Sequence, residues 1–389
     1  MDNLFDERVC ACALNRIFDY EPRYASELIR NLGSAKAVFE LSEKDLDEIL
    51  GPFSKYRGKI NDAARERAAG ELSSLSEKGC LFISFSENCF PSLLKECEDA
   101  PAGLYFRSVS PPEAVFNRGT SVSVVGTRDI SPYGKEWCPK IIGALASTRN
   151  PPTIVSGLAF GVDICAHMAA LAFGLPTIAV LPVGIDSIYP KSHRIAAGKI
   201  ASSPGSALIT DYPPGTQAVP VNFIKRNRII AGLSCATVLV ESKDKGGGTM
   251  TARLAAGYER EVFALPGRID DIRSRGCNRL LAEKIAEPLY STDELVRILG
   301  LESLNRRRTV DFPGEIREKY SGLCSKEEVE MLITVANCIR HSRGISVEEL
   351  CRYCKISYEE TVSLVSALEC DGFIDTDLFQ RCYIHNKKE

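Results

Sequence analysis

Six short apolar segments between residues 121 and 267 constrain the fold of this chain more than any other feature. They are rich in β-branched residues without polar alternation, and helical stretches lie between them. Apolar strands separated by helices are typical of a parallel sheet that is covered on both faces. We therefore predict an α/β fold, with a doubly wound, mostly parallel sheet, over residues 75–290. The expected strands are 121–126, 153–157, 177–182, 207–210, 236–242 and 261–267, and the expected helices are 132–147, 160–173, 224–232 and 249–259.

The segments on either side of this region predict two smaller units. Residues 1–72 carry short stretches of helical periodicity, with Ser34 and Ser42 as expected N-caps, and resemble helix-hairpin-helix or SAM-like modules. Residues 300–324 are polar and are predicted to be a linker. Residues 325–389 are predicted to form a helix, a turn, a longer helix and a hairpin-like tail, which is the pattern of a winged-helix-like domain.

The composition is that of an ordinary globular protein. Of the 389 residues, 44% are apolar and 25% are charged. The first residues carry acids where a signal peptide would carry cations. No apolar run approaches the ~18 residues that are needed to span a bilayer. We therefore expect a cytoplasmic protein that does not contact a membrane.

Fifteen cysteines occur at irregular spacing, which in a chain without an export signal favours reduced and largely buried thiols. Only Cys351 and Cys354 have C-x-x-C spacing, in a segment that is predicted to be helical. With Cys370 and Cys382 they could complete a four-cysteine zinc site. We prefer to interpret them as buried helix positions, and we predict no metal site.

Charge is distributed unevenly along the chain. The whole chain has a net charge of −3, but residues 1–50 have −5 and residues 221–284 have +5. The stretch FIKRNRIIAGLS, at residues 223–234, places three cations around an asparagine, directly before an apolar run. These four residues are Lys225, Arg226, Asn227 and Arg228. A cation near a helix N-terminus is disfavoured by about 0.3–1 kcal/mol, so the cluster indicates a polyanion in front of a helix that the apolar run anchors.

Glycine lies at or shortly after the ends of several expected strands. Three such turns are Gly126-Thr127-Arg128, Ser156-Gly157 and Gly246-Gly247-Gly248-Thr249. Glycine lets the backbone approach a ligand, and the free N–H groups of a following helix hold anions. Because the carboxyl ends of parallel strands share one edge of the sheet, the turns are expected to converge there. The sequence therefore predicts a crevice that binds phosphate or another anion.

The absence of two nucleotide-binding motifs limits which anions the crevice can be expected to bind. The chain has neither a G-x-G-x-x-G nor a Walker A pattern, which disfavours dinucleotides and ATP, and we predict no cofactor. The G-G-G-T stretch resembles a turn of phosphoribohydrolases that release cytokinin-like bases, in which a catalytic Glu follows closely. Here the nearest downstream acid, Glu259, is nearly three helical turns from Thr249. A nucleoside-monophosphate phosphoribohydrolase-like enzyme stays open as the alternative, and we predict that the protein is not an enzyme.

Other residues of catalytic or metal-binding type have simpler interpretations. Asp163 and His167 stand at i and i+4 of one expected helix, a spacing that permits metal ligation. The chain has only four histidines, and no third ligand is apparent. We prefer helix capping for Asp163 and core packing for His167. Ser156 has no His or Asp partner at a recognisable spacing, so we predict no catalytic residue.

Eight motifs occur in an order that resembles a known family. They are VVGTRDISPYG, VSGLAFGVDICAHMAAL, TIAVLPVGIDSIYP, ITDYPPGT, FIKRNRIIAGLS, GGGTMTA, VFALPG and SRGCNRLL. Together they look like the DNA-processing protein A family, also called DprA or Smf, over residues 75–285. The resemblance implies an extended Rossmann-like fold that binds single-stranded DNA without a cofactor. It also implies a homodimer that protects incoming DNA and loads the RecA recombinase during natural transformation and homologous recombination.

The resemblance further implies which residues bind DNA. It places the family's Gly-Thr/Ser-Arg turn at residues 126–128 and its basic turn at residues 225–228. Together with the other glycine turns, this gives the predicted DNA-binding set: Gly126, Thr127, Arg128, Ser156, Gly157, Lys225, Arg226, Asn227, Arg228, Gly247, Gly248 and Thr249.

Three positions depart from the family's usual pattern. Ile224 follows Phe223 where the family usually has Phe-Pro, and Gly246 stands where it usually has Ser. These two changes bear on the geometry of the pocket. His193 stands where the family usually has Asn after its Tyr-Pro element.

Overall fold

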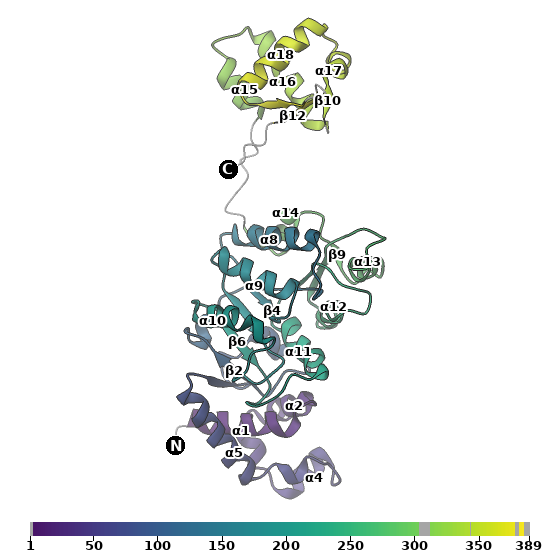
Figure 1. Ribbon diagram of the computed structural model, residues 1–389. Coiled ribbons are helices and arrows are strands. Elements are labelled where there is room, and N and C mark those ends of the chain that lie inside the picture. The colour runs from purple at the N-terminus through teal and green to yellow at the C-terminus, as the bar shows by residue number, and fades with distance from the viewer. Residues whose placement is uncertain (1–2, 303–311, 343, 378–380, 385–389) are drawn as a thin grey trace. The chain divides into compact units, whose positions relative to one another are not determined.

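The computed structural model describes residues 3–302, 312–342, 344–377 and 381–384. The chain divides into two compact units, Met1–Leu304 and Asn305–Glu389. The first unit is built on a large mixed sheet flanked by helices (Figure 1). The predicted α/β fold with a mostly parallel sheet is therefore confirmed for this unit.

All six expected strands are present in the sheet. They are β3 (Ser121–Val125), β4 (Thr153–Ser156), β5 (Thr177–Val180), β6 (Ala207–Thr210), β7 (Ala236–Leu239) and β8 (Glu261–Ala264). Three further strands were not expected: β1 (Leu81–Ser84), β2 (Gly103–Arg107) and β9 (Glu287–Pro288). The first two pair antiparallel with each other and lie outside the alternation of strand and helix that guided the prediction.

The strand order is β1-β2-β6-β5-β4-β3-β7-β8-β9. Neighbours from β6 to β9 are parallel, whereas β2 is antiparallel to both of its neighbours. The chain runs outward from β3 through β4 and β5 to β6, and then returns to β7 on the other side of β3. This reversal between β3 and β7 is a topological switch point, where open α/β sheets bind ligands at the carboxyl ends of their strands.

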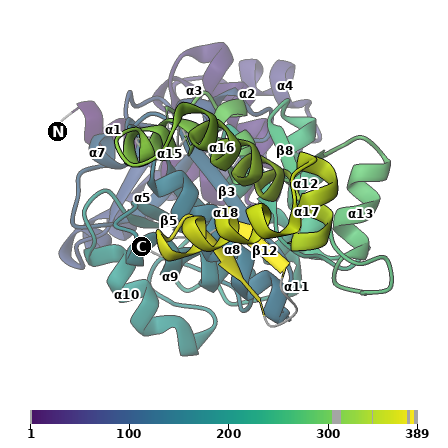
Figure 2. The ribbon, with the colours of Figure 1, turned by 90° about the horizontal axis from the view of Figure 1, so that it is seen from above.

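Helices cover both faces of the sheet. One face shares an apolar core with α8 (Pro132–Ala146), α9 (Val162–Ala172) and α14 (Thr292–Ile298). The core on the other face includes α11 (Pro220–Gly232), α12 (Gly247–Gly257) and α13 (Arg275–Ala282). Of these, α12 and α13 lie side by side (Figures 1 and 2). Between β5 and β6 the chain forms η2 (Lys191–His193) and α10 (Arg194–Ser202).

The predicted helical region at the N-terminus forms five α-helices and a short 3₁₀-helix. They are α1 (Asn3–Phe18), α2 (Pro22–Leu32), α3 (Ala35–Phe39), α4 (Glu43–Leu50), η1 (Arg57–Lys59) and α5 (Asp62–Glu77). Ser34 caps α3 and Ser42 caps α4, as expected. Figure 1 shows these helices, in purple, at one end of the first unit, where they share a core with β1 and β2. Two further short helices are α6 (Ser92–Glu96) and α7 (Pro112–Phe116).

Polar contacts tie the N-terminal helices to the carboxyl edge of the sheet. Asn15 of α1 donates from Nδ2 to the carbonyl oxygen of Asp211, which directly follows β6, over 2.6 Å. The hydroxyl of Tyr20 donates to Oδ1 of Asn222 on α11 over 2.8 Å. The N-terminal helices therefore contribute to the placement of α11.

The described residues of the second unit form four helices and a small antiparallel sheet. The helices are α15 (Phe312–Tyr320), α16 (Lys326–His341), α17 (Val347–Cys354) and α18 (Tyr358–Cys370). The strands β10 (Ile345–Ser346), β11 (Ile374–Thr376) and β12 (Arg381–Ile384) pair in the order β10-β12-β11. Figure 2 shows α15 beside α16, which agrees with their extensive contact.

Part of the predicted linker at residues 300–324 is helical. Within it, α15 is a helix rather than a linker, because its residues Ile316 and Tyr320 are buried in the apolar core of the second unit. Residues 303–311 of the predicted linker lie outside the described residues.

Among the described residues, no group of three or more His, Cys, Asp or Glu side chains is placed to hold a metal ion. Sγ of Cys354 lies 3.7 Å from Sγ of Cys338, while Cys370 is exposed and Cys382 is buried in β12. The alternative of a four-cysteine zinc site therefore gains no support. Among the residues that the structure describes, no helix combines the length and the apolar character that crossing a membrane requires.

Candidate nucleic-acid interface

A pocket of about 590 Å³ lies at the topological switch point. Its walls come from the turns after β3 and β7, the loop before α9, the loop after β5, α11 and the start of α12. Seven of the twelve predicted DNA-binding residues line it: Gly126, Thr127, Arg128, Arg226, Asn227, Gly247 and Gly248. The other five lie elsewhere: Ser156, Gly157, Lys225, Arg228 and Thr249.

Glycines bring the backbones of two turns into contact at this pocket. A Cβ atom on Gly126 would lie 2.5 Å from Cγ2 of Val162 and 2.7 Å from the carbonyl oxygen of Glu241. A Cβ atom on Gly248 would lie 3.0 Å from the Cα of Gly126. Any larger residue would force the turns apart, so glycine is required here for close approach of the main chain.

Three helices begin at the pocket without a side-chain cap. Their N-cap residues are Gly161 for α9, Val219 for α11 and Gly246 for α12. The first N–H groups of a helix have no partner within the helix and carry partial positive charge. At α9 the N–H of Val162 is already bonded to the carbonyl oxygen of Thr127, and α11 begins with Pro220, which has no N–H. The start of α12 is therefore the N-terminus best placed to favour an anion such as phosphate, and the dipoles of α9 and α11 add positive potential.

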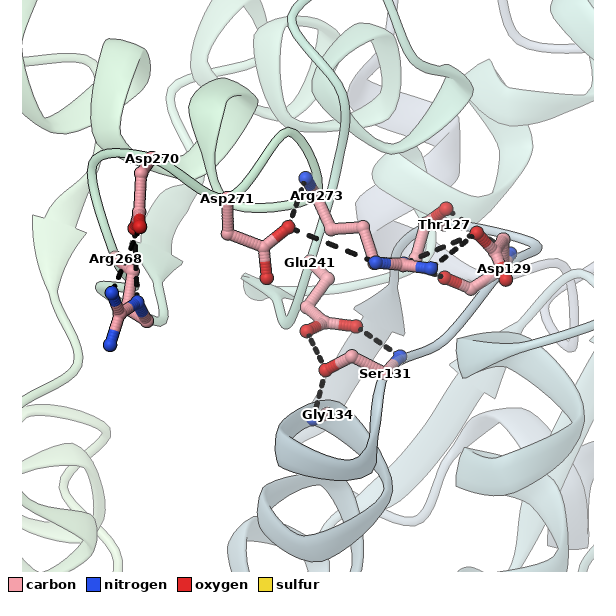
Figure 3. A network of polar contacts seen from close by, with 9 residues as sticks. All are labelled: Thr127, Asp129, Ser131, Gly134, Glu241, Arg268, Asp270, Asp271 and Arg273. Atoms are coloured by element: carbon pink, nitrogen blue, oxygen red, sulfur yellow. Dashed lines mark hydrogen bonds and ion pairs between the residues drawn. The ribbon is translucent and has the colours of Figure 1, made fainter.

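A polar network fixes the turn that follows β3 (Figure 3). The hydroxyl of Ser131 donates to Oε1 of Glu241 over 2.5 Å, and the Ser131 N–H donates to Oε2 over 2.9 Å. Nη2 of Arg273 lies 2.9 Å from Oδ2 of Asp129, and Oδ1 of Asp271 accepts the Arg273 N–H over 2.9 Å. The turn is thus anchored to the end of β7 and to the loop before α13, and the charge of Asp129 is offset by Arg273.

Arg128 is exposed on the rim of the pocket. Its guanidinium lies over the ring of Phe223, at 4.8 Å from the ring centre, and Phe223 meets Tyr189 edge to face at 5.2 Å. Lys243, in the turn after β7, is a second exposed cation on the pocket wall. Cations beside aromatic rings suit a ligand that carries both phosphates and bases.

The expectation that the basic segment stands at a helix N-terminus is wrong. α11 begins at Pro220, so the three cations lie in its second and third turns. Arg226 is buried, and its Nη1 donates to the carbonyl oxygens of Gly157, over 2.7 Å, and Val180. Burial lowers the pKa of Arg226 to about 10, so the group stays cationic at neutral pH. This side chain joins the ends of β4 and β5 and places a positive charge in the floor of the pocket.

Arg228, in contrast, does not line this pocket. It is buried, forms an ion pair with Asp211 and donates from Nη1 to the carbonyl oxygen of Asp99 over 2.6 Å. Burial raises the pKa of Asp211, and the charge of Arg228 opposes that shift. Lys225 is exposed, and its Nζ donates to the carbonyl oxygen of Tyr20 over 3.1 Å, in a neighbouring pocket between α2 and α11.

Three predicted residues with small side chains belong to the framework around the pocket. The Ser156 hydroxyl donates to the carbonyl oxygen of Val124 over 2.7 Å, and the Thr249 hydroxyl donates to that of Gly246 over 2.6 Å. A Cβ atom on Gly157 would lie 2.1 Å from Nη1 of Arg226, so the guanidinium covers this glycine. These residues hold the turns in shape, and their polar groups are already used within the protein.

His167 is a core residue, as we preferred. Its Nδ1 lies 2.7 Å from the hydroxyl oxygen of Thr177, whose proton is donated to the carbonyl oxygen of Ile154. The Thr177 oxygen must therefore accept, which assigns the proton to Nδ1 of His167. Burial lowers the pKa of His167 to about 3, so the ring is neutral at physiological pH.

Asp163 lines the pocket, which the preferred interpretation as a helix cap did not anticipate. Oδ2 of Asp163 accepts the N–H of Ala159 over 3.4 Å, so the carboxylate fixes the loop before α9. Burial raises the pKa of Asp163, and the charge of Arg226 opposes that shift. The prediction also missed Lys243 and Tyr189. Lys243 lies shortly after the end of β7, and this position is the signal that could have identified it. Tyr189 lies in the longer loop between β5 and η2, where no such signal marks it.

Known proteins match this chain over the region that holds the pocket. A family model described as DNA recombination-mediator protein A matches residues 81–300. The DNA processing protein DprA of Streptococcus pneumoniae is 36% identical over 251 residues, which cover 63% of this chain and 86% of that relative.

Two solved structures have a similar fold. The X-ray structure of DprA from Streptococcus pneumoniae has a TM-score of 0.61 at 29% identity, and the match covers 73% of this chain and 97% of that one. A structure of DNA processing protein A from Helicobacter pylori, described as giving insight into its single-stranded DNA binding mode, has a TM-score of 0.50 at 29% identity. That match covers 57% of this chain and 95% of the other. The resemblance in the motifs is thereby confirmed, and this chain belongs to the DNA recombination-mediator protein A family.

Proposed function

We propose that this protein binds single-stranded DNA at the pocket between β3 and β7. The observation that carries the proposal is the pocket itself, where the N-terminus of α12 meets two exposed cations, Arg128 and Lys243, and the buried Arg226. The dipoles of α9 and α11, which also begin there, add positive potential. Two carboxylates, Asp129 and Asp163, lie on the pocket wall. The negative charge of Asp129 is offset by Arg273. The site is therefore suited to the phosphates of a nucleic-acid backbone. The single-stranded DNA binding mode described for the relative from Helicobacter pylori supports the same ligand.

Aromatic side chains favour a single strand over a duplex. Tyr189 and Phe223 line the pocket beside Arg128. Bases stack on such rings only where they are not already paired and stacked within a duplex. Phosphate contacts alone would serve either form of DNA, so the rings supply the discrimination.

Fluorescence anisotropy with a labelled oligo-dT, repeated with the matching duplex at the same salt concentration, tests this function. We expect tighter binding to the single strand, with little dependence on base sequence. An affinity for duplex equal to that for the single strand would overturn the proposal.

We further propose that the protein is not a hydrolase. Glu259, the nearest acid downstream of Thr249, follows the C-terminal end of α12, whereas the pocket is at its N-terminal end. The carboxylate of Asp163 is held by the loop before α9. Incubation with AMP should release no adenine above the rate of a protein-free control, and release well above that rate would favour the phosphoribohydrolase alternative.

The family model that matches this chain is described as a DNA recombination mediator. We therefore propose that the protein protects incoming DNA and loads the RecA recombinase during natural transformation. We also propose that it acts as a homodimer, with a mass in solution of twice the 42.6 kDa of one chain, and that it works in the cytoplasm without a cofactor. Light scattering tests the dimer. Assembly of labelled RecA on a single strand, with and without the protein, tests the loading.

The second unit is proposed to be a winged-helix-like domain that contacts proteins rather than DNA. Its order of helices followed by the antiparallel strands β11 and β12 supports the first part. Its helix α18, YEETVSLVSALEC, carries three Glu and neither Lys nor Arg, which supports the second.

A further inference from the structure

Phe160 is an exposed aromatic residue beside the pocket. It lies in the loop between β4 and α9, and 48% of its surface is exposed. The preceding residue, Ala159, lines the pocket. The following residue, Gly161, rests on the turn after β3, since a Cβ atom there would lie 2.1 Å from the carbonyl oxygen of Thr127. Phe160 is thus held at the rim of the site, one residue from the backbone that positions Arg128.

The loop that carries Phe160 is held in an unusual conformation. Leu158 is buried and has a φ of 56°, a region that residues other than glycine rarely occupy. Nδ1 of His193 lies 2.8 Å from the carbonyl oxygen of Leu158, to which it donates a hydrogen bond. The N–H of Val162 also donates to the carbonyl oxygen of Thr127 over 3.1 Å. Contacts on both sides of Phe160 therefore fix the loop.

His193 also supports the ring of Phe160 directly. The two ring centres are 4.8 Å apart, and the planes meet at 68°, edge to face. Such a pair fixes the orientation of the phenyl ring while half of its surface stays exposed. The phenyl ring is thus a rigid apolar surface that no side chain of the described residues covers completely.

We propose that Phe160, supported by His193, is a stacking position for a base of single-stranded DNA, beyond the phosphate-binding pocket. This inference rests on the proposed function and extends the path of the strand from the switch point toward the loop between β4 and α9. A nucleobase is the occupant that fits, because the ring adjoins a site built for phosphates and every base has an apolar face. His193 is a positioning residue here, since it acts through the ring of Phe160.

The direct test compares the affinity of wild-type protein and Phe160→Ala for a labelled oligo-dT. Loss of one stacked base is expected to weaken binding roughly 5- to 100-fold. The slope of log affinity against log salt should stay unchanged, because no phosphate contact is removed. Phe160→Tyr should bind like wild type. If Phe160→Ala binds with wild-type affinity, the inference is wrong.

Phe173→Ala is the matched control. Phe173 has the same side chain, is 51% exposed and lies at the other end of the same helix, α9, away from the carboxyl edge of the sheet. Its replacement should leave the affinity unchanged. Equal losses for the two variants would show a general effect of removing phenylalanine and would overturn the assignment.

Single abasic positions placed in turn along the oligonucleotide separate stacking from indirect effects. For wild type, affinity should drop when the abasic position meets Phe160, and for Phe160→Ala that drop should disappear. A drop of the same size in the variant would contradict stacking on this ring. His193→Asn keeps a hydrogen-bond donor for Leu158 but loses the ring, so its affinity should fall between those of wild type and Phe160→Ala.

The outcome also distinguishes this inference from the proposed function. If wild type fails to bind oligo-dT, both the function and the stacking position are wrong. If wild type binds and Phe160→Ala binds equally well, the function stands and only the stacking position falls.

Discussion

Arginine reaches the carboxyl edge of the sheet from two regions, the turn at residues 126–128 and the segment at residues 225–228. The surroundings of the arginine side chains differ between the two regions. The guanidinium of Arg128 is exposed over an aromatic ring on the pocket rim. Arg226 is 3% exposed and Arg228 is 5% exposed, and both hold backbone carbonyl groups within the protein. The first arginine is available to a ligand at little cost to the fold, whereas the other two are part of the fold.

The phase of α11 explains why the basic segment turns inward. Asn222, Arg226 and Ile230 recur at a spacing of four residues and are all buried, whereas Val221, Ile224 and Lys225 are exposed. A helix that begins at Pro220 therefore places Arg226 on its inner face. A cluster of cations in a sequence thus predicts a binding surface only when the helix that carries it is placed correctly.

The largest expected effect is on stability, in Arg228→Ala. This change leaves Asp211 as an unpaired buried carboxylate, which costs about 3–5 kcal/mol of the free energy of unfolding. Urea unfolding followed by circular dichroism measures this loss, with Lys225→Ala as the control. If Arg228→Ala unfolds at the same urea concentration as wild type, the ion pair is not part of the framework and the comparison fails.

A smaller effect concerns pH and His167. Burial, together with the positive charge of Arg226, lowers the pKa of His167 to about 3, whereas an unfolded histidine has a pKa near 6.5. The unfolded chain therefore takes up a proton below pH 6.5 that the folded chain refuses. The stabilisation is complete above pH 6.5 and falls by about 1.4 kcal/mol per pH unit between 6.5 and 3.

Urea unfolding of wild type and His167→Gln at pH 6.5 and 5.5 measures this contribution. The loss between the two values should be smaller in the variant by about 1 kcal/mol. Identical losses would mean that His167 is not kept neutral by its surroundings, and would argue against a charged Arg226 close to it.

Lys225→Ala should have little effect on the stability of the protein or on its affinity for oligo-dT. Lys225 is exposed, makes one hydrogen bond to the carbonyl oxygen of Tyr20, and lies outside the main pocket. We expect a change in stability within about 0.5 kcal/mol and an affinity for oligo-dT close to that of wild type. A loss of affinity as large as that of Arg128→Ala would show that the strand also passes over α11.

The smallest effect is expected from removal of the second unit. A chain ending at residue 304, where the first unit ends, keeps every residue of the pocket. Its affinity for oligo-dT should match that of the full chain at equal salt. A truncated protein with a native circular dichroism spectrum that no longer binds would place the second unit in the interface.

Much of the fold was predictable from the sequence. Apolar runs flanked by glycine and helices identified β3 to β8, because strands of a parallel sheet are buried on both faces. β1 and β2 were missed because they are antiparallel and because the helices that follow them, α6 and α7, are only five residues long. α15 was missed because its sequence is mostly polar; Ile316 and Tyr320 anchor it in the core of the second unit.

The site was predictable where it depends on the backbone and not where it depends on burial. The glycine turns at Gly126 and Gly248 meet as expected, since strand ends of one sheet share an edge. The inward direction of Arg226 and Arg228 depends on tertiary contacts with distant segments. No local pattern of charge could reveal those contacts, although Pro220, a common first residue of helices, could have corrected the start of α11.

The most direct test of this account is the salt dependence of oligo-dT binding by Arg128→Ala. For single strands the slope of log affinity against log salt is about −0.7 per phosphate contact, so loss of one contact should flatten the slope by about 0.7 and weaken binding at low salt. The urea midpoint of the variant should equal that of wild type, because Arg128 is exposed. A variant with the wild-type slope and affinity would contradict the account and would show that the exposed arginine at the switch point is not what meets the DNA.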